Sequence, residues 1–202
     1  MNRNRVALAL AVVAVLAVAG TAVLAVRTRG GEHPATTAEP LVVTDPGSGA
    51  SFEVPGKSWE LRGPRSRIYY EDEAGRPSAV VTGPAVYRDG YCAEQPGDSN
   101  RGFAGFTDQP FEAWVASLSD DDGAWSTGDV REETVLADGT AATYRWTGLL
   151  GGGGTCAATG IEVAMVQAGD VRAVLVADSG DEGTLSHDEV RRILLTLRAT
   201  AS

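Results

Sequence analysis

Apolar and polar residues alternate along much of the chain after position 50, and this period of two indicates β-strands. The stretch SFEVP, for example, places Phe52 and Val54 on one face and stops at Pro55. Glycine and aspartate between such runs favour tight hairpin turns. The sequence predicts these turns at residues 89–90, 138–139 and 168–170. The last four strands are therefore expected to form a consecutive antiparallel meander.

Two stretches repeat with the period of a helix instead. The first covers residues 111–122, and its apolar face holds Phe111, Trp114, Val115 and Leu118. The second begins at a capping box made by Ser186 and Glu189, because each of these side chains can bond a free amide of the first turn. Its apolar face holds Val190, Ile193, Leu194 and Leu197. An antiparallel sheet with two main helices packed on one face of it predicts an α+β domain.

The first apolar run of the chain, residues 6–26, contains no charged residue. A helix of this length spans about 30 Å, the thickness of the hydrocarbon core of a bilayer. We therefore predict a transmembrane helix at residues 6–26, with residues 1–5 in the cytoplasm. The competing interpretation is a cleaved signal peptide, because residues 17–19 and 23–25 resemble cleavage sites. The apolar region of a signal peptide usually has only about 7–15 residues, which favours the uncleaved anchor.

Residues 27–50 are rich in Pro, Gly, Thr and Ser, and this composition predicts a flexible linker that holds the following domain off the membrane. The apolar residues 41–43 could instead add an edge strand to the domain. The folded domain is predicted at residues 51–199, which is long enough for one hydrophobic core.

The chain has two cysteines, Cys92 and Cys156, and both follow the export-like segment. An even number of cysteines in this position is typical of a disulfide in an oxidising compartment. Basic residues on the two flanks of the apolar run nearly balance, so the cysteines decide the orientation. We predict a Cys92–Cys156 disulfide in a single-pass protein of the cell membrane whose C-terminal domain lies outside the cytoplasm, or is secreted if the anchor is cut. Two buried free thiols in a cytosolic domain are the alternative.

The formal charge of the chain is −10, and the part after position 29 carries −14, because four of the 17 basic residues precede position 30 and all 27 acidic residues follow it. A domain with this charge repels nucleic acid and anionic lipid. Nucleic acid is thereby excluded as a partner. The expected partners are the membrane, through residues 6–26, and an envelope protein or a small ligand.

The stretch FEVPGKSW at residues 52–59, the antiparallel sheet and the closing helix EVRRILLTLR at residues 189–198 together resemble a known group of proteins. They look like small exported actinobacterial domains of unknown function, which follow a single N-terminal anchor and have a fold similar to the Mog1/PsbP-like sandwich. The resemblance covers about residues 51–199. It implies a cell-surface setting and a binding or assembly role, and it carries over no catalytic residue.

Few stretches of the chain resemble a reactive site. The four glycines at 151–154 lack the lysine that a phosphate-binding loop requires, and we interpret them as slack that lets Cys156 reach Cys92. Ser186, His187 and Asp188 are adjacent in sequence, so their side chains point apart on a helix and form no catalytic triad. We therefore interpret His187 as a solvated residue rather than a pH switch.

Metal ligands are equally sparse. The acidic stretches at 120–122 and 178–182 lack the spacing of a calcium loop, and two cysteines with one histidine in the domain make a poor zinc site. We interpret both stretches as solvated turns, and we predict neither a metal nor a cofactor. Among the tryptophans, Trp59 and Trp114 are predicted in the core and Trp125 on the surface.

Export without a catalytic pattern favours a membrane-anchored extracytoplasmic binding or accessory module that is not an enzyme. The alternative is an extracytoplasmic hydrolase that acts on cell-envelope material through two carboxylates, which would have to meet in one cleft. A third hypothesis is a structural or ligand-storage domain, which an enclosed apolar cavity would favour.

Overall fold

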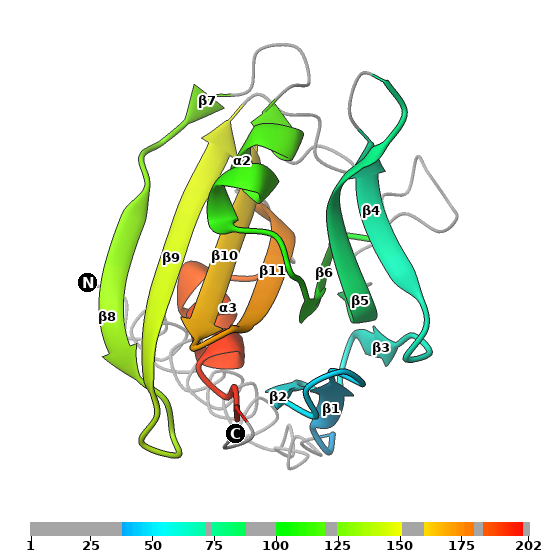
Figure 1. Cartoon of the computed structure of the whole chain (residues 1–202), viewed down its shortest axis with the longest axis vertical. Helices are drawn as coiled ribbons and strands as arrows, with labels where there is room; N and C mark the ends of the chain where they lie inside the picture. The colour runs from blue at the N-terminus through cyan, green and yellow to red at the C-terminus, as the bar shows by residue number, and fades with distance from the viewer. Residues whose placement is uncertain are drawn as a thin grey trace, which may run out of the picture. The chain divides into compact units, whose positions relative to one another are not determined.

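Alternating apolar runs place most of the described chain in β-strands (Figure 1). A computed structural model describes residues 38–71, 74–87, 100–119, 125–150, 160–179 and 184–199. The strands in these ranges are β1 (Leu41–Thr44), β2 (Ser51–Val54), β3 (Trp59–Leu61), β4 (Arg67–Glu71), β5 (Pro77–Tyr87), β6 (Gly102–Phe106), β7 (Trp125–Ser126), β8 (Val130–Val135), β9 (Ala141–Leu150), β10 (Gly160–Ala168) and β11 (Val171–Ser179). The helices in these ranges are α2 (Phe111–Ser119) and α3 (His187–Leu194).

Nine of the described strands form one antiparallel sheet, in which β3, β5, β6, β11, β10, β9 and β7 follow one another. Strand β4 pairs with β5, and β8 pairs with β9. The predicted meander from β8 to β11 is confirmed, because each of these strands pairs with the next. Its turns at Gly139 and Gly169 have φ angles of 89° and 58°, a left-handed conformation that glycine adopts without strain.

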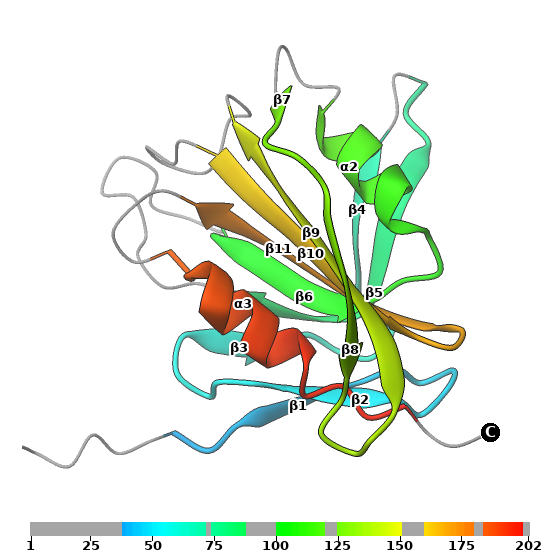
Figure 2. The ribbon, with the colours of Figure 1, turned by 90° about the vertical axis from the view of Figure 1, so that its left-hand side faces the viewer.

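The two helices cover opposite faces of the sheet (Figure 2). Val163 and Met165 of β10 belong to the core cluster under α2, whereas Ala164 and Val166 belong to the cluster under α3. Adjacent residues of a strand point to opposite faces, so each helix has a core of its own. The predicted α+β class is confirmed, but the expectation that both helices lie on one face is wrong.

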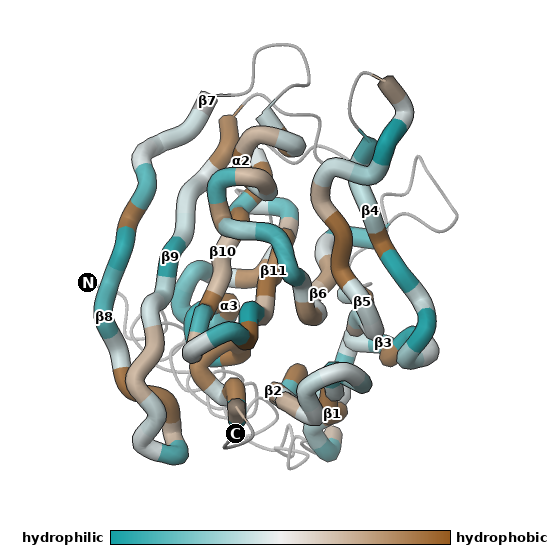
Figure 3. Tube along the Cα trace, viewed as in Figure 1, coloured by the Kyte–Doolittle hydropathy of each residue, from teal (hydrophilic) through white to brown (hydrophobic). Residues whose placement is uncertain are grey.

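Burial on both faces explains the composition of the central strands. β10 and β11 contain long runs of buried residues, as expected for strands covered on each side. Figure 3 shows apolar residues concentrated in β5, β10 and β11 and hydrophilic residues along β4 and β8. Continuous apolar runs in these strands, in place of strict alternation, therefore indicate that both faces of the sheet are covered.

Both predicted helices are confirmed. Phe111, Trp114 and Leu118 of α2 are buried, in the spacing that the sequence predicted. At α3 the Ser186 side chain accepts a hydrogen bond from the Glu189 amide, and the Glu189 side chain accepts one from the Ser186 amide. This reciprocal capping box fixes the first residue of α3.

The folded domain begins before residue 51. Strand β1 pairs with β2 from Leu41 opposite Val54 to Thr44 opposite Ser51, and Val43 is only 1% exposed. The hairpin is tied to the C-terminal segment by two backbone hydrogen bonds between Ser51 and Arg198. The predicted linker 27–50 therefore extends too far along the chain. Its apolar residues 41–43 form a strand instead, which was the alternative interpretation.

Residues 1–5, the predicted span 6–26 and the linker residues 27–37 lie outside the described residues. Within the described ranges, no helix combines the length and apolar character needed to cross a bilayer.

Candidate functional site

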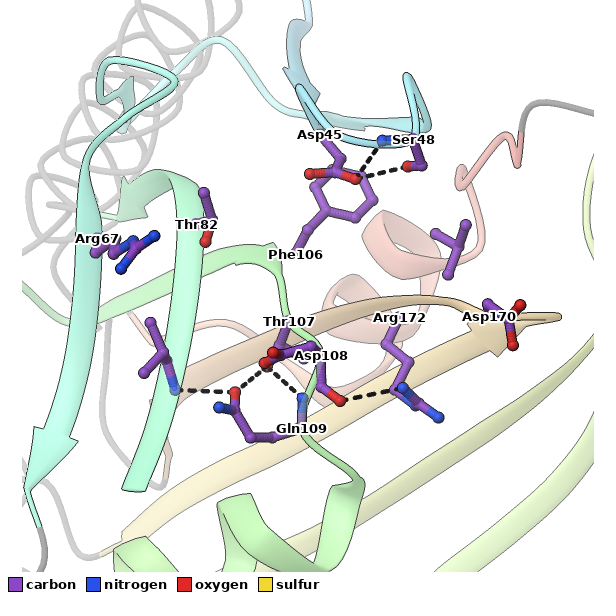
Figure 4. Close-up of a pocket in the computed structure, with 12 residues that line it drawn as sticks. Asp45, Ser48, Arg67, Thr82, Phe106, Thr107, Asp108, Gln109, Asp170 and Arg172 are labelled. Atoms are coloured by element: carbon purple, nitrogen blue, oxygen red, sulfur yellow. Dashed lines mark hydrogen bonds between the residues drawn. The ribbon is translucent and has the colours of Figure 1, made fainter. Parts of the chain in front are cut away.

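A pocket of about 470 Å³ opens where the β1–β2 turn, β4, β5, the loop after β6 and the β10–β11 hairpin meet (Figure 4). This volume lies within the range of about 300–1,000 Å³ that is typical of small-molecule sites. Buried Phe106 forms part of its wall. Its charged lining residues are Asp45, Asp108, Asp170, Arg67 and Arg172. The pocket is open and has charged groups in its lining, unlike the enclosed apolar cavity that a ligand-storage domain would need.

A break in the sheet creates room for the pocket. The pairing of β5 with β6 shifts between Thr82 and Ala85, and Gly83 adopts a φ of +57° there. On the C-terminal side of this bulge β5 pairs with β6 in register, whereas the residues before Thr82 pair with β4 on the other side. Gly105 faces Val81 closely, since a Cβ atom at this position would stand 2.5 Å from a Val81 methyl group. Strand β6 ends at Phe106, opposite Thr82, so the stretch of β5 before Thr82 has no β6 neighbour.

The loop between β6 and α2 fills this gap with side chains. Gln109 Oε1 accepts hydrogen bonds from the Val80 amide at 3.2 Å and from the Thr107 hydroxyl at 2.7 Å. Thr107 Oγ1 in turn accepts one from the indole Nε1 of Trp114 at 3.2 Å. Trp114 is fully buried in α2. The wall of the pocket is therefore anchored to the core through a chain of hydrogen bonds, which satisfies polar groups that the interrupted sheet leaves free.

Arg172 holds the same loop from the side of β11. Its Nη1 donates to the Asp108 carbonyl at 3.2 Å and its Nε donates to Gln167 Oε1 at 3.3 Å. The Thr107 amide also donates to the Arg172 carbonyl at 3.1 Å. The Arg172 head group is thus largely used in positioning the loop.

The charged groups of Asp45 and Arg67 are less occupied by contacts within the protein than the Arg172 guanidinium is. Asp45 Oδ2 accepts hydrogen bonds from the amide and hydroxyl of Ser48, at 2.8 and 2.6 Å. Partial burial alone would raise the pKa of Asp45, but these bonds together with the Gly47 amide outweigh it and hold the pKa below its ordinary value. Arg67 is exposed at the start of β4 and makes no ion pair with any residue that the structure describes. One wall therefore carries a fixed carboxylate and another a free guanidinium.

A second polar cluster lies at the N-terminus of α3. His187 Nδ1 is 2.8 Å from Glu162 Oε1, and the imidazole centroid is 4.2 Å from the ring of Trp146. The Glu162 side chain is only 9% exposed and that of His187 is 34% exposed. Burial raises the pKa of Glu162, although the hydrogen bond and charge of His187 oppose this effect. The interpretation of His187 as a solvated residue is wrong, because the sheet supplies it with a buried partner.

Tyr144 lies beside this cluster and is fully buried. Its hydroxyl has no hydrogen-bond partner among the described residues, and burial together with the charge of Glu162 raises its pKa. The Arg191 guanidinium lies 5.6 Å from the centre of the Tyr144 ring. A phenol in this setting stays neutral and contributes packing instead of acid–base chemistry.

The pattern of a family described as "Domain of unknown function (DUF8017)" matches residues 33–202. The chain belongs to this family. The predicted membership of a family of unknown function is therefore confirmed, whereas export and actinobacterial origin stay predictions. No curated protein matches the sequence.

Among solved structures, the chain is similar to cyanobacterial PsbP (CyanoP) from Synechocystis sp. PCC 6803, determined in solution. The two sequences are 11% identical, the TM-score is 0.43, and the match covers 85% of this chain and 99% of that chain.

The structure tests some of the residues singled out from the sequence. Trp59 and Trp114 lie in the core, as predicted, at 6% and 0% exposure. Asp178 is a buried residue of β11, with Oδ2 3.9 Å from Arg101 Nε, so its interpretation as part of a solvated turn is wrong. The Trp125 side chain lies outside the described part of the structure, as do residues 120–122.

Cys92, Cys156 and the glycines at 151–154 also lie outside the described residues. The predicted disulfide therefore remains a prediction.

Sequence reasoning missed the pocket entirely. Asp45, Arg67, Gln109 and Arg172 come from four separate segments, and none carries a motif. One signal was available, because TDQP at 107–110 separates a strand from a helix with polar residues and ends at the proline that opens α2. The convergence of that loop with β1, β4 and β11 is a property of the tertiary structure.

Proposed function

We propose that this chain is a membrane-anchored extracytoplasmic binding module without catalytic activity, and that the pocket holds a small polar ligand. The observation that supports this most directly is the pocket itself, in which hydrogen-bonding groups from several elements surround about 470 Å³. A rigid, hydrogen-bonded wall with a few charged groups is typical of a site that binds and orients a ligand.

The anchor at residues 6–26 and the position outside the cytoplasm are part of the same proposal. A Cys92–Cys156 disulfide belongs to the same proposal, and the described ends of the two cysteine-containing segments support that bond. Tyr87 pairs with Gly102, and Gly160 pairs with Leu150, all at one end of the sheet. Only β11 lies between β6 and β10, so the starts of these two strands are two interstrand spacings apart across the sheet, about 10 Å, and are offset along β11 from Ala177 to Ser179. The described strand ends that flank the two cysteine-containing segments therefore lie near each other, as the proposed Cys92–Cys156 bond requires.

A carboxylate-dependent hydrolase is the second candidate, because Asp45, Asp108 and Asp170 line the same pocket. Such an enzyme needs one carboxyl group whose pKa is raised so that it can donate a proton. The pKa of Asp45 is lowered, and the carboxyl with a raised pKa, Glu162, lies outside the pocket lining and is bound to His187. The distribution of charge thus favours binding over hydrolysis.

Ligand capture by the full chain in detergent micelles tests the proposal. The protein is incubated with a small-molecule extract of cell envelopes, and the retained compounds are identified by mass spectrometry. Thr82→Trp should fill the pocket, whereas Val135→Trp places the same bulk on an exposed position of β8.

We expect the wild-type chain and Val135→Trp to retain a compound that Thr82→Trp does not retain. Equal retention by all three proteins would contradict binding in the pocket. Conversion of the retained compound by the wild-type chain would support the hydrolase instead. Membrane anchoring is tested separately, by the need for detergent to release the protein from sedimented membranes.

A further inference from the structure

Two opposite charges face the pocket from different sides and do not neutralise each other. Asp45 lies in the turn between β1 and β2, and Arg67 lies at the start of β4 (Figure 4). Among the described residues, neither side chain forms an ion pair with the other or with a third group. Both bonds of Asp45 to Ser48 end on Oδ2, and with the Gly47 amide counted as well the carboxylate keeps acceptor capacity at Oδ1 for a cation.

The neutral residues of the pocket lining include a hydrogen-bond donor. Gln109 Oε1 is identified as the oxygen of its amide, because it accepts from the Val80 backbone N–H, which can only donate. The Nε2 group of Gln109 is therefore left to donate, and no described residue accepts from it. An acceptor bound near Arg67 would find a second donor in this amide.

The charged residues of the pocket lining restrict which charges the ligand can carry. Three aspartates and two arginines line it, and Arg172 is already bonded to the Asp108 carbonyl and to Gln167. The three carboxylates would repel a purely anionic ligand. A purely cationic ligand would leave the Arg67 guanidinium unpaired. A ligand with both charges satisfies both walls.

We propose, on the basis of the binding function above, that the pocket takes a small zwitterion with an ammonium and a carboxylate group, as in a free α-amino acid or a short peptide. The ammonium group binds Asp45 Oδ1. The carboxylate group binds the Arg67 guanidinium and Gln109 Nε2.

Calorimetric titration of the full chain in detergent micelles tests this assignment. The probes are alanine, phenylalanine and alanyl-alanine, each compared with its N-acetylated form, which lacks the ammonium, and with its amide, which lacks the carboxylate. We expect each cap to weaken binding about tenfold or more, the effect of losing one charge-assisted hydrogen bond. Preference for the amino acids over the dipeptide, or the reverse, distinguishes the two sources of the zwitterion.

Two variants assign each charge to its partner. Arg67→Gln should abolish the difference between a probe and its amide, and Asp45→Asn should abolish the difference between a probe and its N-acetylated form. Asn at position 45 still accepts from Ser48, so the turn is retained. The matched controls are Arg65→Gln, an exposed arginine outside the pocket lining, and Asp138→Asn, which accepts a similar turn hydrogen bond from Thr140.

Capped probes that bind as tightly as the parent compounds would overturn the zwitterion while leaving a binding pocket. The same conclusion follows if no probe binds but an envelope compound is retained in a manner that Thr82→Trp abolishes. If neither experiment detects binding, both the zwitterion and the proposed function are overturned.

Discussion

Removal of one hydroxyl should test the structural basis of the pocket. Thr107→Val preserves the shape of the side chain but leaves the indole Nε1 of Trp114 without its acceptor. Trp114 is 0% exposed, so water cannot replace the lost partner. An unsatisfied buried donor costs about 1–3 kcal/mol, and the bonds that Thr107 makes with Gln109 are lost as well.

We therefore expect Thr107→Val to lower the free energy of unfolding by about 2–3 kcal/mol. For a domain of this size each kcal/mol shifts the melting temperature by about 2–4 °C, so the midpoint should fall by about 4–12 °C. The measurements are urea denaturation, for the free energy, and thermal unfolding, for the melting temperature, of the full chain in detergent, followed by tryptophan fluorescence and by circular dichroism.

Two variants control the interpretation. Thr107→Ser keeps the hydroxyl and should lose no more than about 1 kcal/mol, the value of one buried methyl group. Thr143→Val removes a hydroxyl that bonds only to Glu133 at the surface, and it should change stability by less than about 0.5 kcal/mol. If Thr107→Val is as stable as Thr143→Val, the hydrogen-bond chain from Trp114 does not support the pocket wall.

Further perturbations test other parts of the structure. Arg145 bonds Glu112 and Asp129 and lies 4.5 Å from the Phe111 ring, so Arg145→Met should cost about 1–3 kcal/mol in urea denaturation. Ser186→Ala should cost about 1 kcal/mol through loss of the capping box, seen as a melting temperature lowered by about 2–4 °C. Burial raises the pKa of Glu162 above its ordinary 4.5, so its contribution to stability is complete below that pH and is lost as the pH rises through the folded-state pKa. Glu162→Gln should accordingly gain stability relative to the wild type between acidic and neutral pH, and a constant difference would contradict this. Reducing agent should lower the melting temperature by about 10 °C, because a Cys92–Cys156 bond would contribute about 4 kcal/mol through loop closure, whereas an unchanged value would indicate free thiols.

Much of the fold could be predicted because local patterns agree with tertiary packing. The S-x-x-E capping box at Ser186 and the turns at Gly139 and Gly169 are local devices, and each is formed by neighbouring residues. The period of apolar residues in α2 also needs only one covered face. Such features are encoded within a few residues, so they can be predicted without knowledge of the rest of the chain.

The tertiary structure, and not the local sequence, decides which face of the sheet each helix covers. α2 packs on Val163 and Met165 while α3 packs on Ala164 and Val166, and a continuous apolar run such as residues 163–166 gives no sign of this assignment. The same limit applies to β1, whose short apolar run becomes a strand only because β2 is there to pair with it.

His187 shows the difference most directly. Its neighbours in sequence, Ser186 and Asp188, indicated an exposed first turn, and its buried partner Glu162 is 25 positions away on β10. Asp45 and Arg67 likewise meet at one pocket only through the arrangement of the β1–β2 turn and β4. The sequence alone determined the two helices and the β8–β11 meander, because hydrogen bonding and apolar period within these segments are local. The tertiary structure alone decided which charges are buried, paired or left facing a ligand, because those properties depend on residues that come together only in the folded chain.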